Sequence, residues 1–246
     1  PDRPGTGGRE QQVVVFAATS LREVFTAIGE DFERAHPGVE VIFNFAGTQE
    51  LRTQLEHGSR GDVLASADRR HVEELALRGR VQPPVIFARN EPVIVVAREA
   101  ASVIRSLADL PNAERIVIGA PEVPIGRYTL ALLDRAAATL GPDFRARVLA
   151  RVVSLEPNVR QVLAKVRLGE AQAGVVYRTD VRAETAVAVV AIAEDVNVVA
   201  DYPIAVVSDA THPRLARAWV DFVMSDRGQG VLQRAGFLPP ALGTAP

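Results

Sequence analysis

The sequence predicts an α/β protein of two lobes, each a mainly parallel sheet flanked by helices. Short apolar runs alternate with segments of helical spacing in the first part of the chain, which is the pattern of a parallel sheet covered by helices. A second strand–helix series starts after Pro92, and the two closing helices have no strand of their own nearby. The closing segment is therefore expected to return to the first lobe.

The first series reads as three strand–helix pairs. Val13–Ala17 is an apolar run typical of a buried strand, and apolar residues from Leu21 to Phe32 then recur at helical spacing until Pro37-Gly38 ends the helix. The remaining elements of this series are expected at Val39–Phe45 (strand), Leu51–Gly58 (helix), Asp62–Ser66 (strand) and Asp68–Leu77 (helix).

The second series contains most of the remaining strands. We expect strands at Val93–Ala97, Arg115–Gly119, Val152–Leu155, Ala173–Tyr177, Val187–Ile192 and Ile204–Val207. Helices are expected at Gly126–Leu140, at Phe144–Ala150 and around Val162. Two more helices close the chain, the first with Trp219 on its apolar face.

Two crossing segments, near Phe87–Pro92 and Asp201–Ala205, are expected to divide the chain. They assign residues 13–87 and 206–240 to the first lobe and residues 88–205 to the second. Residues 1–12 lack periodicity and predict a disordered leader, and residues 241–246 predict a matching tail. Because two-lobed α/β proteins usually hold a ligand between the lobes, the cleft is the expected site.

Composition narrows the classes of function. The 246 residues carry a net charge of −2, so no basic field is available for a nucleic acid, and we expect no nucleic-acid partner. The longest apolar runs are far shorter than the ~20 residues that a membrane-spanning helix needs. The absence of cysteine excludes thiolate metal sites and cysteine nucleophiles, and Lys165 is the only lysine.

Four strand-to-helix junctions share one chemical character. Each exposes free backbone N–H groups at the positive end of a helix, and several such ends at one cleft would bind an anion without fixed positive charge. The junctions are Ala17–Leu21, Phe45–Thr48, Pro124–Gly126 and Pro157–Val159. Taken singly, each is more simply a helix start. Ser20 and Glu23 match a capping box, and Thr48 and Asn158 are good N-caps.

Other candidate groups are few. Tyr177 ends a strand and is either a cleft hydroxyl or, more commonly, a half-buried core tyrosine. Arg127 and Arg160 lie at anion-type junctions and could neutralise a dianion, although surface arginines are the commoner case. Asp68 is expected to cap a helix. The four histidines are scattered, and the sequence shows no metal-ligand cluster, nucleophile elbow, phosphate loop or dinucleotide fingerprint. We therefore expect no catalytic residue, no cofactor and no metal held by side chains.

Seven short motifs follow one another in a specific order and spacing. They are Val15–Leu21, Phe45–Thr48, Gly61–Asp68, Val123–Tyr128, Asn158–Arg160, Gly174–Tyr177 and Tyr202–Val207. In this order they resemble the motifs of the molybdate-binding periplasmic proteins of bacterial ABC importers, which have the type II periplasmic-binding-protein fold. The resemblance runs from Val13 to Pro239, which is nearly the whole chain.

The resemblance implies a set of ligand-binding residues. That family holds a tetrahedral oxyanion by hydroxyl and backbone N–H groups. The positions that carry over are the hydroxyls of Ser20 and Thr48, the N–H groups of Ile125 and Val159, and the phenol of Tyr177. Two departures stand out. The second loop, usually serine-rich, reads Gly47-Thr48-Gln49 here, and Ile125 replaces the usual small residue before Gly126.

The resemblance also implies a function. It implies an extracytoplasmic solute-binding protein that captures molybdate, and also tungstate, and delivers the anion to the permease subunits of an ABC transporter. It further implies a monomer that is periplasmic or lipid-anchored through a removed N-terminal segment.

Three alternatives stay open. One is a receptor for another tetrahedral oxyanion such as sulfate. Another is an enzyme on the same two-lobed scaffold, such as a porphobilinogen-deaminase-like transferase, which the missing cysteine disfavours. The last is the ligand-sensing domain of a transcription regulator, which the missing helix-turn-helix segment disfavours.

Overall fold

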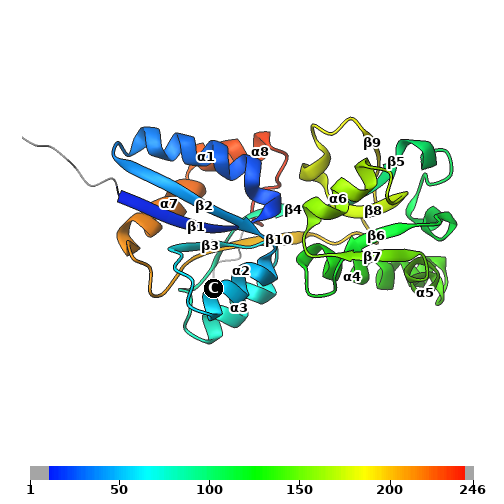
Figure 1. Cartoon of the computed structure of the whole chain (residues 1–246), viewed down its shortest axis with the longest axis horizontal. Helices are drawn as coiled ribbons and strands as arrows, with labels where there is room; N and C mark the ends of the chain where they lie inside the picture. The colour runs from blue at the N-terminus through cyan, green and yellow to red at the C-terminus, as the bar shows by residue number, and fades with distance from the viewer. Residues whose placement is uncertain (1–10, 242–246) are drawn as a thin grey trace, which may run out of the picture.

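The computed structural model describes residues 11–241 and contains two five-stranded sheets, each with helices on both faces (Figure 1). The first lobe is built from β1 (Gln11–Ala18), α1 (Arg22–Ala35), β2 (Val39–Ala46), α2 (Thr48–Glu56), β3 (Val63–Ala65), α3 (Arg69–Leu77), β4 (Val85–Asn90), β10 (Ala200–Val206), α7 (Pro213–Met224) and α8 (Asp226–Arg234). The second lobe is built from β5 (Pro92–Ala97), β6 (Ile116–Gly119), α4 (Pro124–Leu140), α5 (Phe144–Leu149), β7 (Val152–Glu156), α6 (Val159–Arg167), β8 (Ala173–Tyr177) and β9 (Val187–Val190). Short 3-10 helices are η1 (Thr19–Leu21), η2 (Arg98–Ala100), η3 (Leu107–Asn112) and η4 (Arg178–Val181).

Both sheets are mainly parallel, as the sequence predicts. The first has the strand order β2-β1-β3-β10-β4, in which β10 runs antiparallel to both of its neighbours. The second has the order β7-β6-β8-β5-β9, in which β5 runs antiparallel to both of its neighbours. Each sheet thus contains a single strand that opposes the other four, and the expected two-lobed α/β fold is confirmed.

The closing helices return to the first lobe, as expected. Helices α1, α7 and α8 cover one face of the first sheet, and α2 and α3 cover the other (Figure 1). On the first face, Trp219 is fully buried with the rings of Phe25 and Phe32 packed edge-on at 5.7 and 5.3 Å between centroids. Burying such aromatic side chains is worth roughly 1.5–3 kcal/mol each, so this cluster anchors the C-terminal segment to the lobe.

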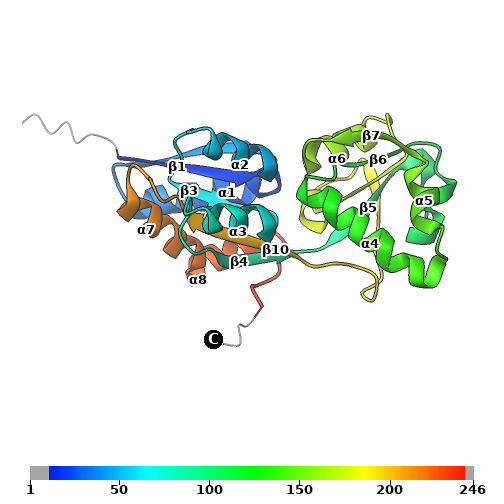
Figure 2. The same ribbon diagram turned by 90° about the horizontal axis from the view of Figure 1, so that it is seen from below.

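The strand pairing places the lobe boundaries at different residues from those that we expected. Strand β4 continues to Asn90 and pairs with β10, whose first residue is Ala200. Residues 88–90 and 200–205, expected in the second lobe, therefore belong to the first sheet. The chain crosses between the lobes at Glu91 and again between β9 and β10 (Figure 2).

The N-terminal boundary of the fold also differs from the prediction. Gln11 and Gln12, expected in the leader, begin β1 and pair with Val39 and Glu40 of β2. The rest of the predicted leader and residues 242–246 of the predicted tail lie outside the described residues.

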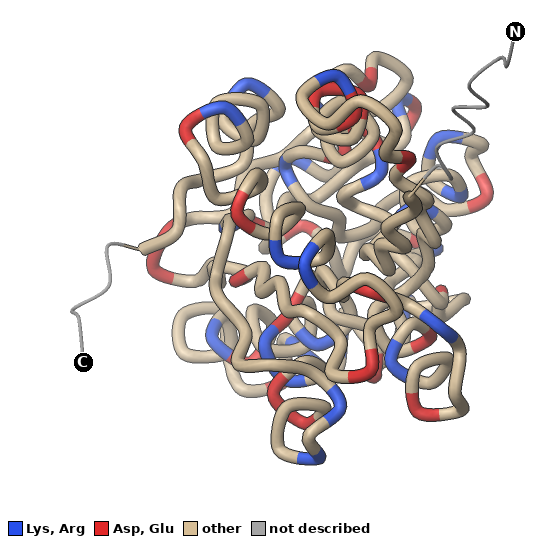
Figure 3. Tube along the Cα trace, turned by 90° about the vertical axis from the view of Figure 1, so that its left-hand side faces the viewer, with Lys and Arg blue, Asp and Glu red and all other residues tan. Residues whose placement is uncertain are grey.

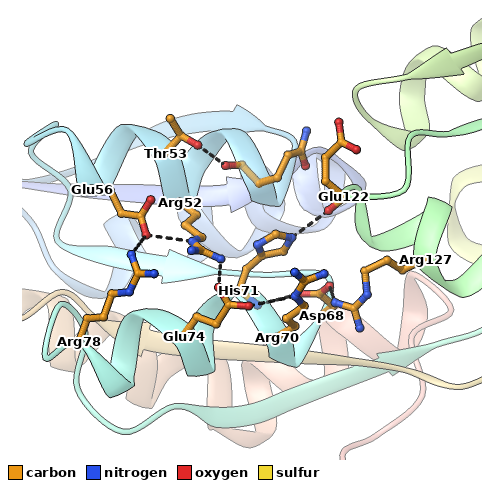
Figure 4. Close-up of polar contacts among 11 residues, drawn as sticks. Arg52, Thr53, Glu56, Asp68, Arg70, His71, Glu74, Arg78, Glu122 and Arg127 are labelled. Carbon is orange, nitrogen blue, oxygen red and sulfur yellow. Dashed lines mark hydrogen bonds and ion pairs between the residues drawn. The ribbon is translucent and has the colours of Figure 1, made fainter.

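Charged residues of both signs are interspersed along the chain (Figure 3). Many form ion pairs between neighbouring helices. Arg52 of α2, for example, pairs with Glu56 of its own helix and with Glu74 of α3 (Figure 4). Within residues 11–241, no helix has both the length and the apolar character needed to cross a bilayer.

Candidate anion-binding site

A small cavity lies where the two lobes face each other. The empty space within it, including its opening to solvent, is about 230 Å³. The lining residues are Ala18, Thr19, Ser20, Ala46, Gly47, Thr48, Ala67, Val123, Pro124, Ile125, Asn158, Val159 and Tyr177. All five residues predicted to bind the oxyanion belong to this lining, so the fold brings together positions that are far apart in the sequence.

Four helical segments begin at the cavity, two in each lobe. Thr48 is the first residue of α2, Val159 is the first residue of α6, and Ile125 is the second residue of α4. Ser20 lies in η1, directly before α1. The first N–H groups of a helix have no partner within that helix, so these four starts direct unpaired donors and positive dipole ends at one small space.

Two hydroxyl groups line the cavity from the first lobe. The Ser20 Oγ lies 3.0 Å from the Tyr202 Oη, and both side chains are buried. The Thr48 Oγ1 accepts a hydrogen bond of 3.2 Å from the Ala67 N–H. Each hydroxyl is thus held by another group of the first lobe.

The capping roles that we considered for these hydroxyls are not found. Neither Ser20 nor Thr48 makes a side-chain cap; the residues in the N-cap positions are Ala18, Leu21 and Gly47. A capping box at Ser20 is therefore wrong, because its hydroxyl bonds to a tyrosine instead.

Two other predicted caps are confirmed. The Asn158 Oδ1 accepts from the Gln161 N–H at 3.1 Å, and the Asp68 Oδ1 accepts from the His71 N–H at 3.3 Å.

Tyr177 supplies the third hydroxyl, from the second lobe. Only 1% of the residue is exposed, and its Oη has no hydrogen-bond partner among the described residues. Burial raises the pKa of the Tyr177 phenol well above its ordinary value, so the group stays protonated and donates. The backbone N–H of Tyr177 donates to the Asp180 Oδ2 at 3.0 Å, which fixes the end of β8.

Within the described chain, the lining holds no charged side chain. Arg127 and Arg160, considered above as partners of a dianion, do not line the cavity; they pair with Asp68 and Glu23. The site is therefore a small neutral space whose polar groups are mainly hydrogen-bond donors. Such a site can hold an anion that accepts several hydrogen bonds.

Polar contacts join the two lobes beside the cavity (Figure 4). The Arg127 Nη1 donates to the Asp68 Oδ2 at 2.7 Å across the cleft, and the Asp68 side chain is only 1% exposed. The His71 Nε2 donates to the Glu122 carbonyl oxygen at 2.9 Å. His71 is buried. The two contacts join the start of α3 to the first turn of α4 and to the segment that leads into it.

A second set of contacts closes the cavity where α2 meets α6. The Gln49 Nε2 donates to the Pro157 carbonyl oxygen at 2.7 Å. Gly47 lies so near the same carbonyl that a Cβ atom placed on it would be 2.5 Å from the Pro157 oxygen. The lobes therefore touch backbone to backbone at this point, as in the closed form of a two-lobed binding protein.

Arg160 links α6 to the first lobe through Glu23 of α1. The same guanidinium lies 3.7 Å from the fully buried carboxylate of Asp180. Burial raises the pKa of Asp180 from 3.8 to about 7, an effect that Arg160 opposes. This chain of charges runs just behind Val159 and Tyr177.

Sequence reasoning missed two residues at this site. Tyr202 lies directly behind Ser20, although the two are 182 positions apart. Asp180 is buried behind Tyr177. Tyr202 begins one of the seven motifs, Tyr202–Val207, which was a signal for its importance. Nothing in the sequence indicated that Asp180 is buried.

Two α/β lobes that close over a small cavity lined with donors define a ligand-binding protein of the two-lobed periplasmic type. Comparison with known proteins agrees. The chain belongs to the bacterial extracellular solute-binding protein family, whose profile matches residues 13–238.

Relatives and solved structures support the resemblance found in the sequence. The molybdate-binding protein ModA of Mycobacterium tuberculosis is 40% identical over 243 residues, which are 98% of this chain and 88% of ModA. The periplasmic molybdate-binding protein of Azotobacter vinelandii superposes with a TM-score of 0.80 at 17% identity, covering 93% of this chain and 99% of that one. The sulfate-binding protein SubI of M. tuberculosis superposes with a TM-score of 0.85 at 18% identity, covering 94% and 88%. The two superpositions show the shared fold.

The same comparison bears on the enzyme alternative. The relatives are solute-binding proteins rather than enzymes. Residues 11–241 also contain no group of three or more His, Cys, Asp or Glu side chains placed to hold a metal ion.

Proposed function

We propose that this protein captures molybdate, and also tungstate, in the interlobe cavity and delivers it to the permease of an ABC transporter. The observation that carries the proposal is the neutral cavity, lined by the hydroxyls of Ser20, Thr48 and Tyr177 and by helix starts from both lobes. A tetrahedral oxyanion has four acceptor oxygens, which is the chemistry that converging donors recognise. Molybdenum would be bound as its oxyanion, without direct coordination by side chains.

Relatives support the choice of ligand. The mycobacterial ModA named above covers nearly the whole chain. Sulfate is the competing ligand, since it is also a tetrahedral dianion and a sulfate-binding protein shares the fold. The donors alone do not separate the two anions, so sulfate is included in the test.

Closure couples binding to transport. Ser20 and Thr48 belong to the first lobe, whereas Ile125, Val159 and Tyr177 belong to the second. An anion in the cavity reaches all of these groups only when the lobes meet, so binding favours the closed form. We propose that the closed monomer is the form that docks on the permease. The family is extracellular, and we place the protein in the periplasm or on a lipid anchor outside the membrane.

Isothermal titration of ligand-stripped protein with molybdate, tungstate, sulfate and phosphate tests the proposal. We expect tight binding of molybdate and tungstate and weak binding of phosphate, because phosphate carries a proton that finds no acceptor in a site of donors. Weaker binding of molybdate than of sulfate would assign the site to sulfate. No binding of molybdate, or equal binding of phosphate, would refute the proposal.

Substitutions at Ser20 locate the anion. Ser20→Ala should weaken molybdate binding by roughly one to two decades, since a hydrogen bond to a charged group is worth about 1.5–3 kcal/mol. Ser20→Asp should abolish binding, because it places a carboxylate against a dianion. Ser59 is exposed and outside the cavity, so Ser59→Ala and Ser59→Asp serve as matched controls with unchanged affinity. Wild-type affinity in Ser20→Asp would remove Ser20 from the site.

A further inference from the structure

Tyr202 lies directly behind the cavity without lining it. The residue is on β10, its side chain is fully buried, and its Oη is 3.0 Å from the Ser20 Oγ. Its ring packs edge-on against Tyr177 at 5.7 Å between centroids. Either oxygen of the Ser20–Tyr202 pair can donate, so the direction of this bond has to come from the acceptors available to each hydroxyl.

The hydrogen of the Tyr202 hydroxyl needs an acceptor, because the phenol is fully buried. The amide of Asn90, on the adjacent strand β4, is engaged elsewhere: its Oδ1 accepts from the Glu91 N–H at 2.9 Å, and its Nδ2 donates to the Thr179 Oγ1 at 2.8 Å.

The Ser20 Oγ is the acceptor that the structure provides for this hydrogen. A buried hydroxyl without an acceptor is costly, so the bond is expected to run from Tyr202 to Ser20. The hydrogen of Ser20 is then excluded from the side occupied by Tyr202 and turns toward the cavity. Thr48 is oriented in the same sense, because its Oγ1 accepts from the Ala67 N–H.

We propose that Tyr202 is a specificity-determining residue, which holds the Ser20 hydroxyl as a hydrogen-bond donor and so makes the cavity reject oxyanions that carry a proton. This inference rests on the proposed function, because it assumes that Ser20 contacts the anion. A fully deprotonated oxyanion can accept a hydrogen bond from the Ser20 hydroxyl with any of its oxygens. Hydrogen phosphate brings a hydrogen of its own, which meets the hydrogen of Ser20 unless that hydroxyl can turn.

Tyr202→Phe tests the role of the phenol. The substitution keeps the buried ring and vacates the space of its oxygen, so that Ser20 can turn its hydrogen away and present a lone pair to the cavity. The readout is the ratio of the dissociation constants of hydrogen phosphate and molybdate in mildly alkaline buffer, where both anions are divalent. We expect the ratio to fall by about tenfold, the effect of one hydrogen bond to a charged group. The affinity for molybdate should fall less than in Ser20→Ala.

Two companion variants make the test specific. Tyr128→Phe deletes a hydroxyl from the same aromatic stack but outside the cavity lining, and it should keep the wild-type ratio. In a Ser20→Ala background, Tyr202→Phe should leave the ratio unchanged, since its effect acts through Ser20. Thermal melting checks that each variant is folded before its ratio is compared.

The outcomes separate the two proposals. Wild-type protein that fails to bind molybdate overturns the proposed function. Wild-type protein that binds molybdate and rejects hydrogen phosphate, with the same ratio in Tyr202→Phe, overturns the role of Tyr202 alone. A fall in the ratio that persists in the Ser20→Ala background also overturns it, because Tyr202 would then act by another route.

Discussion

Gly47→Ala is expected to obstruct closure of the lobes without disturbing either lobe. Gly47 has φ −62° and ψ 142°, an extended conformation that alanine adopts freely. The added Cβ would lie 2.5 Å from the Pro157 carbonyl oxygen of the other lobe and 2.5 Å from the Gln49 Nε2. The flexible amide of Gln49 can move away. The carbonyl belongs to the backbone, so the lobes themselves must separate.

The size of the effect follows from this geometry. An ordinary contact begins near 3.4 Å, so the two lobes must part by about 1 Å at a point where they now hydrogen-bond. Overpacking of this kind typically costs about 1–3 kcal/mol. Because the clash exists only in the closed form, the whole cost should fall on binding, which weakens affinity for molybdate by about 5- to 150-fold.

The assay compares three quantities between wild type and variant. Titration calorimetry measures affinity, thermal melting measures the stability of the ligand-free protein, and X-ray scattering measures the radius of gyration with and without molybdate. We expect weaker affinity, an unchanged ligand-free melting temperature and a smaller compaction on binding. Gly230→Ala is the matched control, since a Cβ there meets only the tip of Arg234. Wild-type affinity and full compaction in Gly47→Ala would refute the closed packing described above.

Further substitutions probe the contacts around the cavity. Arg127→Gln leaves Asp68 buried without its cation in the closed form, so molybdate affinity in calorimetry should fall tenfold or more while the ligand-free melting temperature stays constant. Tyr177→Phe should weaken molybdate binding about tenfold in calorimetry, because it removes a hydroxyl donor that lines the cavity from the second lobe. Asp180 has a pKa raised by burial from 3.8 to about 7, so the native state holds its proton more tightly than the unfolded chain. Its contribution to stability is full below about pH 4 and is lost as the pH rises through about 7. Chemical denaturation across this window should show a decline that Asp180→Asn flattens; an equal decline in both proteins would contradict the shift.

Local patterns in the sequence predicted most of the fold. In strands such as Val13–Ala17 and helices such as that around Val162, the spacing of the apolar residues matches the side of the element that is buried. Both elements are found within a few residues of the expected bounds. Strand β4 was missed, since it lies where the crossing segment was expected. Strand β10 begins four residues earlier than Ile204, because Pro203 concealed the continuity of a strand with a local shift in register.

The candidate site, too, could be predicted from the sequence only in part. Helix starts can be recognised one junction at a time, which is why the four junctions were identified before the fold was known. The individual binding positions Ser20, Thr48, Ile125, Val159 and Tyr177 followed from the family resemblance. Partners that come from distant strands leave no local pattern. The bond between Ser20 and Tyr202 depends on β10 lying beside β3, a pairing that only the assembled sheet reveals.

The position of bound molybdate tests the central claim most directly. Crystals grown with molybdate and measured at the molybdenum absorption edge would locate the metal from its anomalous signal, without reference to the protein atoms. We predict one strong peak in the interlobe cavity, with its oxygens within hydrogen-bonding distance of Ser20 and Thr48 from one lobe and of Ile125, Val159 and Tyr177 from the other. A peak outside this cavity, or contacts from one lobe alone, would contradict the account.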